Sequence, residues 1–213
     1  MAQNEGRPAP EDFSIPERIV LASGNAHKVR EMQELLAPLG IRLLSNKDLE
    51  GLEEVVEDAS TLEGNAHKKA RYIYEQTGYA ALADDTGLLV EALDGAPGVY
   101  SARYAGAGAS DKDNVVKLLR ELAHKRTRRA RFRTVLMFVC EYGTFSFDGE
   151  CRGSIRKFPS GDGGFGYDPV FEPEGYRRTF AELSADEKNN ISHRGRAIRQ
   201  FIGFLEYMKG DAR

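Results

Sequence analysis

The chain has 213 residues, of which 41% are hydrophobic and 9% aromatic, so it can bury an ordinary core as one domain or as one domain with two lobes. Its 30 Lys and Arg residues against 33 Asp and Glu residues give a formal net charge of -3, which excludes a protein-wide positive field that would attract nucleic acid. Any anion site must therefore be local.

The two ends of the chain carry no pattern of a folded element. Residues 1–16 lack the apolar core of a signal peptide and are predicted to be a disordered leader, and 210–213 a short tail. No apolar run approaches the roughly 20 residues of a transmembrane helix. Cys140 and Cys151 lack the spacing of a zinc cluster and are predicted to be reduced structural thiols, so a cytoplasmic protein is expected.

The first third of the chain alternates between strand and helix patterns. Glycines end both predicted helices, and a stretch rich in acidic residues between them indicates a loop. The predicted elements are a strand at 18–22, a turn at 23–25, a helix that ends at Gly40, a strand at 41–44, a loop at 50–58 and a helix at 65–77 before Gly78.

A pair of carboxylates follows the third predicted strand. Residues 79–83 form this strand, and it is predicted to run into a turn, Asp84-Asp85-Thr86-Gly87. Carboxylates are ligands that Mg²⁺ prefers, and one beside a metal-bound water can act as a general base. The same composition also suits a turn whose carboxylates cap backbone N–H groups, so both interpretations stay open.

The second half of the chain contains a predicted hairpin and a glycine-rich loop. The predicted elements are a helix at 111–122 with Ser110 as its N-cap, strands at 131–142 and 144–157 that turn near Gly143, a loop at 160–166, a short strand at 169–173 and a last helix from Ser192 to about Lys209. The pattern indicates an α/β fold with parallel, helix-connected strands and a hairpin that forms a second lobe, with a cleft between the lobes.

Two segments suit the two ends of a nucleotide. The turn from Ser23 to Lys28 joins a strand to a helix N-terminus, which attracts phosphate, although such turns also merely cap helices. In the glycine-rich segment 161–168, Phe165 and Tyr167 suit a planar ligand, or they fold into the core. The side chains of Lys188, His193 and Arg194, predicted at the start of the last helix, either face the same cleft or are solvated.

A basic stretch at 125–133 supports the rival hypothesis of a nucleic-acid-binding module. The stretch lies between a predicted helix and a predicted strand, and Phe132 is its only aromatic residue. A solvated loop is therefore expected there.

From Arg18 to about Tyr207 the chain resembles the inosine triphosphate pyrophosphatases. The resemblance is carried by motifs that occur in a specific joint order: Ser-Gly-Asn-x-x-Lys-x-x-Glu at 23–31, Asn65-Ala66 with Lys69-Ala70, Ala-Asp-Asp-Thr-Gly-Leu at 83–88, Gly-Ala-Pro-Gly-Val-Tyr-Ser-Ala-Arg-Tyr at 95–104, Gly-Phe-Gly-Tyr-Asp-Pro at 164–169, and Glu187-Lys188 with Ser192-His193-Arg194.

The resemblance implies an elongated α/β fold with a central mixed sheet, flanking helices and two lobes around a substrate cleft. It implies one nucleotide pyrophosphatase domain over 17–209, in a homodimer. The implied activity is Mg²⁺-dependent hydrolysis of inosine, deoxyinosine and xanthosine triphosphates to the monophosphate and pyrophosphate. The alternative is a nucleotide- or nucleic-acid-binding module without turnover.

The resemblance also assigns roles to residues. Asp85 is implied as proton acceptor and magnesium ligand, and Glu57 as a second ligand. Arg194 and His193 are candidate donors to a purine O6, and Asp168 is a candidate acceptor for N1–H. Thr86 stands where many relatives have Ser. The implied substrate-binding residues are Ser23, Gly24, Asn25, Ala26, His27, Lys28, Thr86, Phe165, Gly166, Tyr167, Asp168, Lys188, His193 and Arg194.

Overall fold

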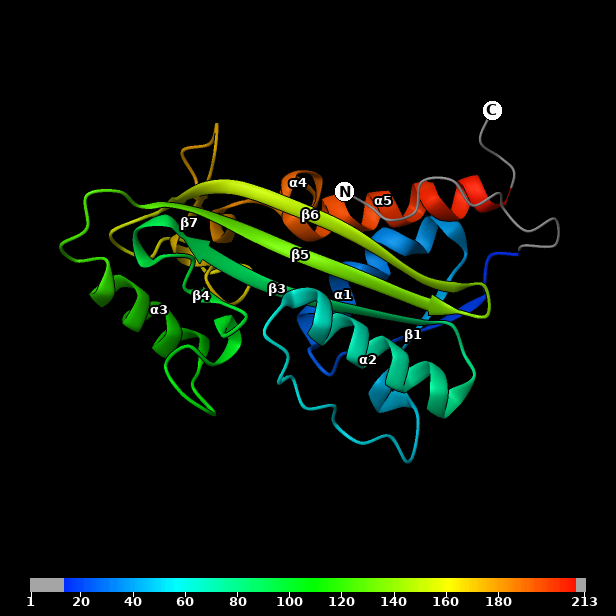
Figure 1. The fold of residues 1–213 in the computed structure, drawn as a ribbon. Helices are drawn as coiled ribbons and strands as arrows, with labels where there is room; N and C mark the ends of the chain where they lie inside the picture. The colour runs from blue at the N-terminus through cyan, green and yellow to red at the C-terminus, as the bar shows by residue number, and fades with distance from the viewer. Residues whose placement is uncertain (1–13, 210–213) are drawn as a thin grey trace. The chain divides into compact units, whose positions relative to one another are not determined.

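The computed structural model describes residues 14–209; the predicted tail and all but the last three residues of the predicted leader lie outside this range. The chain is α/β, with mixed strand pairing (Figure 1). The helices are α1 (Ala26–Leu36), α2 (Leu62–Thr77), α3 (Asp111–Glu121), α4 (Ala185–Ile191) and α5 (His193–Met208). The strands are β1 (Arg18–Leu21), β2 (Arg42–Ser45), β3 (Ala81–Val90), β4 (Pro97–Gly98), β5 (Arg129–Cys140), β6 (Gly143–Ile155) and β7 (Phe171–Pro173).

The strand order is β2-β1-β3-β5-β6-β7, and β4 pairs with β3. β1 is parallel to both β2 and β3, whereas β4 is antiparallel to β3 and β7 is antiparallel to β6. β5 and β6 are neighbours joined by a short turn before Gly143. The predicted α/β class, the mixed sheet and the long hairpin are therefore confirmed.

The chain divides into two compact units. The first unit contains the described residues up to Asp85, 135–148 and 196 onward, and the second unit contains 86–134 and 149–195. β3, β5 and β6 contribute residues to both units. The extent of a single domain over 17–209 stays a prediction, as does a cleft between lobes.

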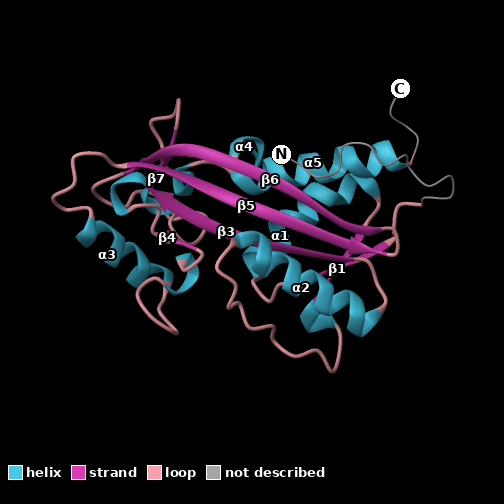
Figure 2. Cartoon of the chain, viewed as in Figure 1, coloured by secondary structure: helices cyan, strands magenta, loops and turns pink. Residues whose placement is uncertain are grey.

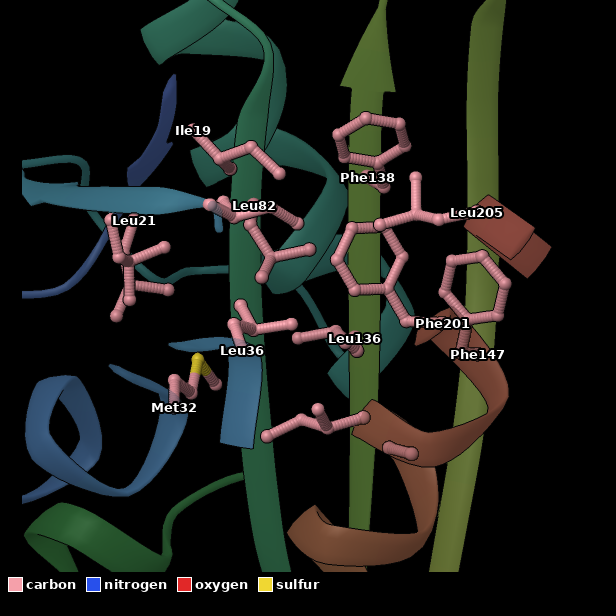
Figure 3. Packing of buried hydrophobic residues seen from close by; sticks show 14 of the residues in the cluster. Ile19, Leu21, Met32, Leu36, Leu82, Leu136, Phe138, Phe147, Phe201 and Leu205 are labelled. Carbon is pink, nitrogen blue, oxygen red and sulfur yellow. The ribbon is translucent and has the colours of Figure 1, made fainter. Parts of the chain in front are cut away.

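Alternating side chains of the central strands build the core of the first unit, because successive residues of a strand point to opposite faces. Ile19 and Leu21 of β1 and Leu82 of β3 pack on the same side as α1 and α5 (Figure 3). α2 lies on the opposite side of these strands (Figure 2). Helices thus cover both faces of these strands. Their packing holds in place the residues that follow the carboxyl ends of the strands.

β3 corrects one prediction from the sequence. The structure has no turn at 84–87, because β3 continues through these residues to Val90. Gly87 permits this course: a Cβ there would meet the carbonyl oxygen of Gly98 in β4 at 2.8 Å. β3 pairs with β1 only at Ala81 and Leu82, so the two aspartates still lie just beyond the end of the parallel pairing.

The second unit has a separate hydrophobic core, formed by residues of β3, α3, β5, β6 and the segment 167–183. Ser110 caps α3 as predicted: its hydroxyl accepts from the Asp113 N–H, and the Asp113 carboxylate accepts from the Ser110 N–H. Such a capping box satisfies N–H groups that the helix itself leaves unpaired.

The basic stretch is only partly the solvated loop that was expected. Arg129 and the residues after it belong to β5. The Arg128 guanidinium donates to the backbone carbonyls of Ile155, Leu122 and Arg156. Arg128 thus connects the end of α3 with the end of β6. Because its N–H groups donate to carbonyls within the protein, these contacts do not favour nucleic-acid binding.

Cys140 and Cys151 are both buried free thiols, as predicted. None of the helices within residues 14–209 combines the length and the apolar character that crossing a membrane requires.

Candidate active site

The turn after β1 begins α1 with a side-chain cap. The Asn25 Oδ1 accepts from the N–H groups of His27 at 3.0 Å and Lys28 at 3.4 Å. The Ser23 hydroxyl accepts from the Asn25 N–H. The capping alternative for this turn is therefore present, and it occupies two N–H groups that a phosphate would otherwise contact. The positive end of the helix dipole and Lys28 remain features that attract an anion.

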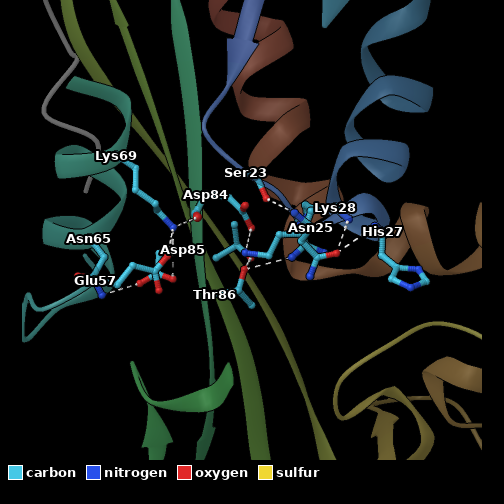
Figure 4. A network of polar contacts seen from close by, with 12 residues as sticks. Ser23, Asn25, His27, Lys28, Glu57, Asn65, Lys69, Asp84, Asp85 and Thr86 are labelled. Atoms are coloured by element: carbon cyan, nitrogen blue, oxygen red, sulfur yellow. Dashed lines mark hydrogen bonds and ion pairs between the residues drawn. The ribbon is translucent and has the colours of Figure 1, made fainter. Parts of the chain in front are cut away.

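Asp84 and Asp85 extend to opposite sides of β3 (Figure 4). The Asp84 carboxylate pairs with Lys28 of α1 at 3.1 Å, and its own side chain is fully buried. The Asp85 carboxylate accepts from the Asn65 side-chain amide of α2 at 3.0 Å. One strand thus presents a carboxylate to each of the two helices that cover it.

Lys69 of α2 is the centre of the polar cluster on the Asp85 side. Its ammonium contacts Glu57 Oε1 at 2.6 Å and Asp85 Oδ1 at 3.9 Å, and it donates to the backbone carbonyl of Asp84 at 2.8 Å. Glu57, which comes from a loop, and Asp85, which comes from a strand, are therefore brought to the same nitrogen atom.

Burial and neighbouring charges change two pKa values in this cluster. Burial raises the pKa of the Asp85 carboxyl, and the negative charge of Glu57 acts in the same direction. Burial alone would lower the pKa of the Lys69 ammonium, but the three carboxylates around it outweigh this effect and raise it. The carboxylates around Lys69 therefore favour a cation at this position.

Two side chains of α2 hold the loop that carries Glu57. The Asn65 side-chain oxygen accepts from the Ala59 N–H, and Lys68 donates to the Val56 carbonyl and pairs with Asp58. Thr61 caps the helix immediately after this loop. The position of Glu57 is therefore set by α2.

Glu57 and Asp85 suit a magnesium ion that takes few ligands from the protein. Within residues 14–209 no three His, Cys, Asp or Glu side chains are grouped as a metal site. Mg²⁺ in nucleotide enzymes commonly binds one or two carboxylates, with phosphate oxygens and waters as its other ligands. Glu57 and Asp85, the two carboxylates beside the Lys69 ammonium, supply this number of protein ligands.

The second unit contains a cluster around Phe165. The Asp168 Oδ2 accepts from the Phe165 N–H at 2.9 Å and from the Lys188 ammonium at 2.8 Å. Lys188 lies 4.8 Å and the Arg194 guanidinium 5.5 Å from the centre of the Phe165 ring. The half-buried aromatic ring is thus held by two cations.

Tyr167 follows the alternative in which the aromatic residues of the loop fold inward. Its ring is part of the core of the second unit, and its hydroxyl donates to the Ser101 carbonyl at 2.8 Å. Burial raises the pKa of Tyr167, so its hydroxyl stays protonated and can donate this bond. The Tyr167 side chain therefore anchors the loop in the core.

The solvated alternative for the three basic residues is wrong, because Lys188, His193 and Arg194 are only 6%, 3% and 2% exposed. Lys188 also lies on α4, and not at the start of the last helix as predicted. Ser192 has an extended backbone that ends α4, and its hydroxyl accepts from the Gly195 N–H at the start of α5. The sequence pattern did not separate these two helices.

His193 and Arg194 have different surroundings. The His193 ring stacks on Phe132 with centroids 4.5 Å apart. The Arg194 guanidinium donates to the Thr86 hydroxyl at 3.3 Å, and this hydroxyl shares a 2.6 Å hydrogen bond with the Thr134 hydroxyl. Thr86, predicted to bind substrate, thus connects Arg194 with β5.

The predicted site residues form two groups. In the first unit, Glu57 and Asp85 lie around Lys69 on one side of β3, and Lys28 meets Asp84 on the other side. The second unit contains Phe165, Tyr167, Asp168, Lys188, His193 and Arg194. Sequence reasoning assigned no role to Asn65, Lys69 or Thr134. For Asn65 and Lys69 a signal existed, because residues four apart share one face of a helix.

Comparisons with known proteins identify relatives over nearly the whole chain. A model described as the Ham1 family matches residues 19–204. The dITP/XTP pyrophosphatase of Flavobacterium psychrophilum is 49% identical over 189 residues, which cover 89% of this chain and 99% of that protein. The dITP/XTP pyrophosphatase of Chlorobaculum tepidum is 51% identical over 201 residues, 84% of this chain and 88% of that protein. The solved structure of a HAM1 protein from Coxiella burnetii has a TM-score of 0.82 and 42% identity, and covers 89% of this chain and 98% of that chain.

Proposed function

Because the chain belongs to the Ham1 family, we propose that it is a dITP/XTP pyrophosphatase, which hydrolyses inosine, deoxyinosine and xanthosine triphosphates to the monophosphate and pyrophosphate. This activity removes deaminated purine nucleotides from the nucleotide pool. The observation that carries the proposal is the polar cluster around Lys69, where carboxylates and lysines meet beyond the end of the parallel strands.

In this proposal Asp85 accepts the proton of the attacking water. A bond forms between the water oxygen and the α-phosphorus, the bond from that phosphorus to the pyrophosphate oxygen breaks, and the water proton moves to an Asp85 oxygen. Asn65 holds the other Asp85 oxygen by its 3.0 Å hydrogen bond, which orients the carboxylate. Lys28 and the N-terminus of α1 bind the phosphate chain.

Glu57 and Asp85 would hold Mg²⁺, which neutralises phosphate charge when it is bound. We expect Glu57→Gln to raise the magnesium concentration needed for half-maximal activity, since an amide is a weaker ligand than a carboxylate. Glu54→Gln, an exposed glutamate of the same loop, is the matched control. A magnesium titration compares them, and identical curves for both variants would count against ligation by Glu57.

The second unit is proposed to bind the base. Hypoxanthine and xanthine carry an O6 acceptor and a protonated N1, whereas adenine carries a 6-amino donor and an unprotonated N1. Arg194 and His193 are the candidate donors to O6. Asp168 is the candidate acceptor for N1–H, although its Oδ2 already accepts from Phe165 and Lys188. A site of this kind can discriminate by about 10⁴-fold, because the wrong base leaves buried polar groups unpaired.

One assay tests the proposed function. Pyrophosphate release is measured for inosine, deoxyinosine, xanthosine, guanosine and adenosine triphosphates, with Mg²⁺ and with a chelator. We expect rapid release from the first three, much slower release from ATP, and none with the chelator. Release of single phosphates would identify an ordinary phosphatase, and binding without turnover would identify a binding module. Light scattering on the same sample tests the proposed homodimer.

A further inference from the structure

Three consecutive residues of the glycine-rich loop are fastened by groups outside their own backbone. The Phe165 N–H donates to Asp168, and the Tyr167 hydroxyl donates to the Ser101 carbonyl. Between them, the Gly166 N–H donates to the Asp111 Oδ2 at 2.7 Å. Phe165 comes immediately before Gly166, which has a φ of 61° and, because it lacks a Cβ, restrains the backbone little. External contacts must therefore hold the ring.

Asp111 is the first residue of α3, and it differs from the other acidic residue in that turn. Asp113 is used inside the helix terminus, where its carboxylate accepts from the N–H and the hydroxyl of Ser110. Asp111 instead reaches a residue 55 positions away in sequence. Two carboxylates of one helical turn thus have separate tasks, capping for Asp113 and a loop contact for Asp111.

The helix that carries Asp111 is itself fixed to the segment that anchors Tyr167. The buried Asn114 side chain accepts from the Ala105 N–H at 2.8 Å and donates to the Ala102 carbonyl at 3.1 Å. Lys117 donates to the Tyr104 carbonyl at 2.7 Å. Because Ser101 begins the same segment, α3 and the anchor of Tyr167 are one connected frame.

We propose that Asp111 is a positioning residue for base recognition: its carboxylate holds the Gly166 peptide and thereby fixes the Phe165 ring against Lys188 and Arg194. This inference rests on the proposed function for its link to the base. Asp111 acts through the loop and does not contact the substrate. The Asp111 side-chain oxygen is the acceptor for the Gly166 N–H, so its loss frees the loop at its middle residue.

The kinetic test compares three variants. Asp111→Ala should raise KM for inosine triphosphate about 10-fold, with a smaller change in kcat, and should reduce the preference for inosine triphosphate over ATP. Asp111→Asn should restore most of this preference, because an amide oxygen still accepts from the Gly166 N–H. Asp113→Ala is the matched control: it removes an acidic residue from the same turn and should lower Tm without changing the preference.

A second measurement needs no substrate. Hydrogen exchange of the peptide that covers 162–168 should accelerate in Asp111→Ala and stay at the wild-type rate in Asp113→Ala. Equal exchange in these two variants would overturn the proposal. An Asp111→Asn variant as impaired as Asp111→Ala would also overturn it, and would indicate an effect of charge on α3 alone. If the wild-type protein releases no pyrophosphate, the proposed function fails, while the exchange result still decides whether Asp111 holds the loop.

Discussion

Asp84 and Asp85 are neighbours in sequence, yet they serve different helices. Strand geometry turns successive side chains to opposite faces, so Asp84 meets Lys28 of α1 while Asp85 meets Asn65 and Lys69 of α2. Asp84 has a cationic partner at 3.1 Å, whereas Asp85 accepts at 3.0 Å from a neutral amide and lies 3.9 Å from the Lys69 ammonium. The two carboxylates should therefore respond differently to substitution.

We expect Asp85→Asn to lower kcat by about 10²-fold or more, because it removes the proposed proton acceptor, which is also a proposed magnesium ligand. Its Tm should stay the same or rise, since burial raises the pKa of this carboxyl and an amide removes the cost of a buried charge. The amide oxygen introduced by this substitution can still accept from Asn65. Steady-state kinetics and thermal unfolding without Mg²⁺ check both expectations. Near-wild-type turnover would remove Asp85 from the mechanism.

The sequence could predict those roles that depend only on residues within one helical turn. Ser110 was predicted as an N-cap because a hydroxyl followed by acidic residues and a helical pattern acts within one turn. The side chains of Lys69 and Thr134 contact residues 12 to 48 positions away, and those pairings depend on the tertiary fold. The contact of Asp111 with Gly166 is of the same kind, so no spacing pattern could indicate it.

At the scale of elements, α4 and α5 approach closely at Gly195. A Cβ on Gly195 would overlap the backbone carbonyl oxygen of Asn189 in α4, whereas Gly203, farther along α5, has open space around it. A backbone carbonyl cannot rotate away as a flexible side chain can. Gly195 thus allows the short connection that places Lys188 and Arg194 in one cluster.

Gly195→Ala should therefore destabilise the protein by about 1–3 kcal/mol and reduce activity, because the overlap displaces the adjacent Arg194. Gly203→Ala is the control in the same helix, and it should be neutral or stabilise by about 0.5–1 kcal/mol through helix propensity. Urea unfolding measures both. If the two variants unfold at the same midpoint, the close packing of α4 on α5 has no energetic consequence.

Turn composition explains why the course of β3 was not predicted. Asp-Asp-Thr-Gly favours a turn when only local preferences act. The strand continues because β4 pairs with it at Leu88 and Leu89, and because lysines from two helices compensate the aspartates. Tertiary contacts thus override the local preference where the candidate catalytic residue lies.

At the scale of the whole molecule, each unit has its own core and its own polar cluster. The core of the first unit includes residues of β1, α1 and α5, and that of the second includes residues of α3 and β7. The sequence indicated the α/β class and the hairpin because both follow from hydrophobic periodicity. The assignment of residues to two units could not follow from periodicity, since β3, β5 and β6 each contribute to both.

This separation predicts two kinds of kinetic defect. Lys28→Ala should lower kcat/KM for inosine triphosphate and ATP by a similar factor, because every nucleoside triphosphate presents the same phosphates. Arg194→Ala should lower kcat/KM for inosine triphosphate much more than for ATP, because its guanidinium is a proposed donor to O6. The double variant should show the product of the two single effects, as expected for residues that act on separate parts of a substrate. Thermal unfolding controls for the loss of the Arg194 hydrogen bond to Thr86. An equal loss on both substrates in Arg194→Ala would instead assign Arg194 to phosphate binding or to folding.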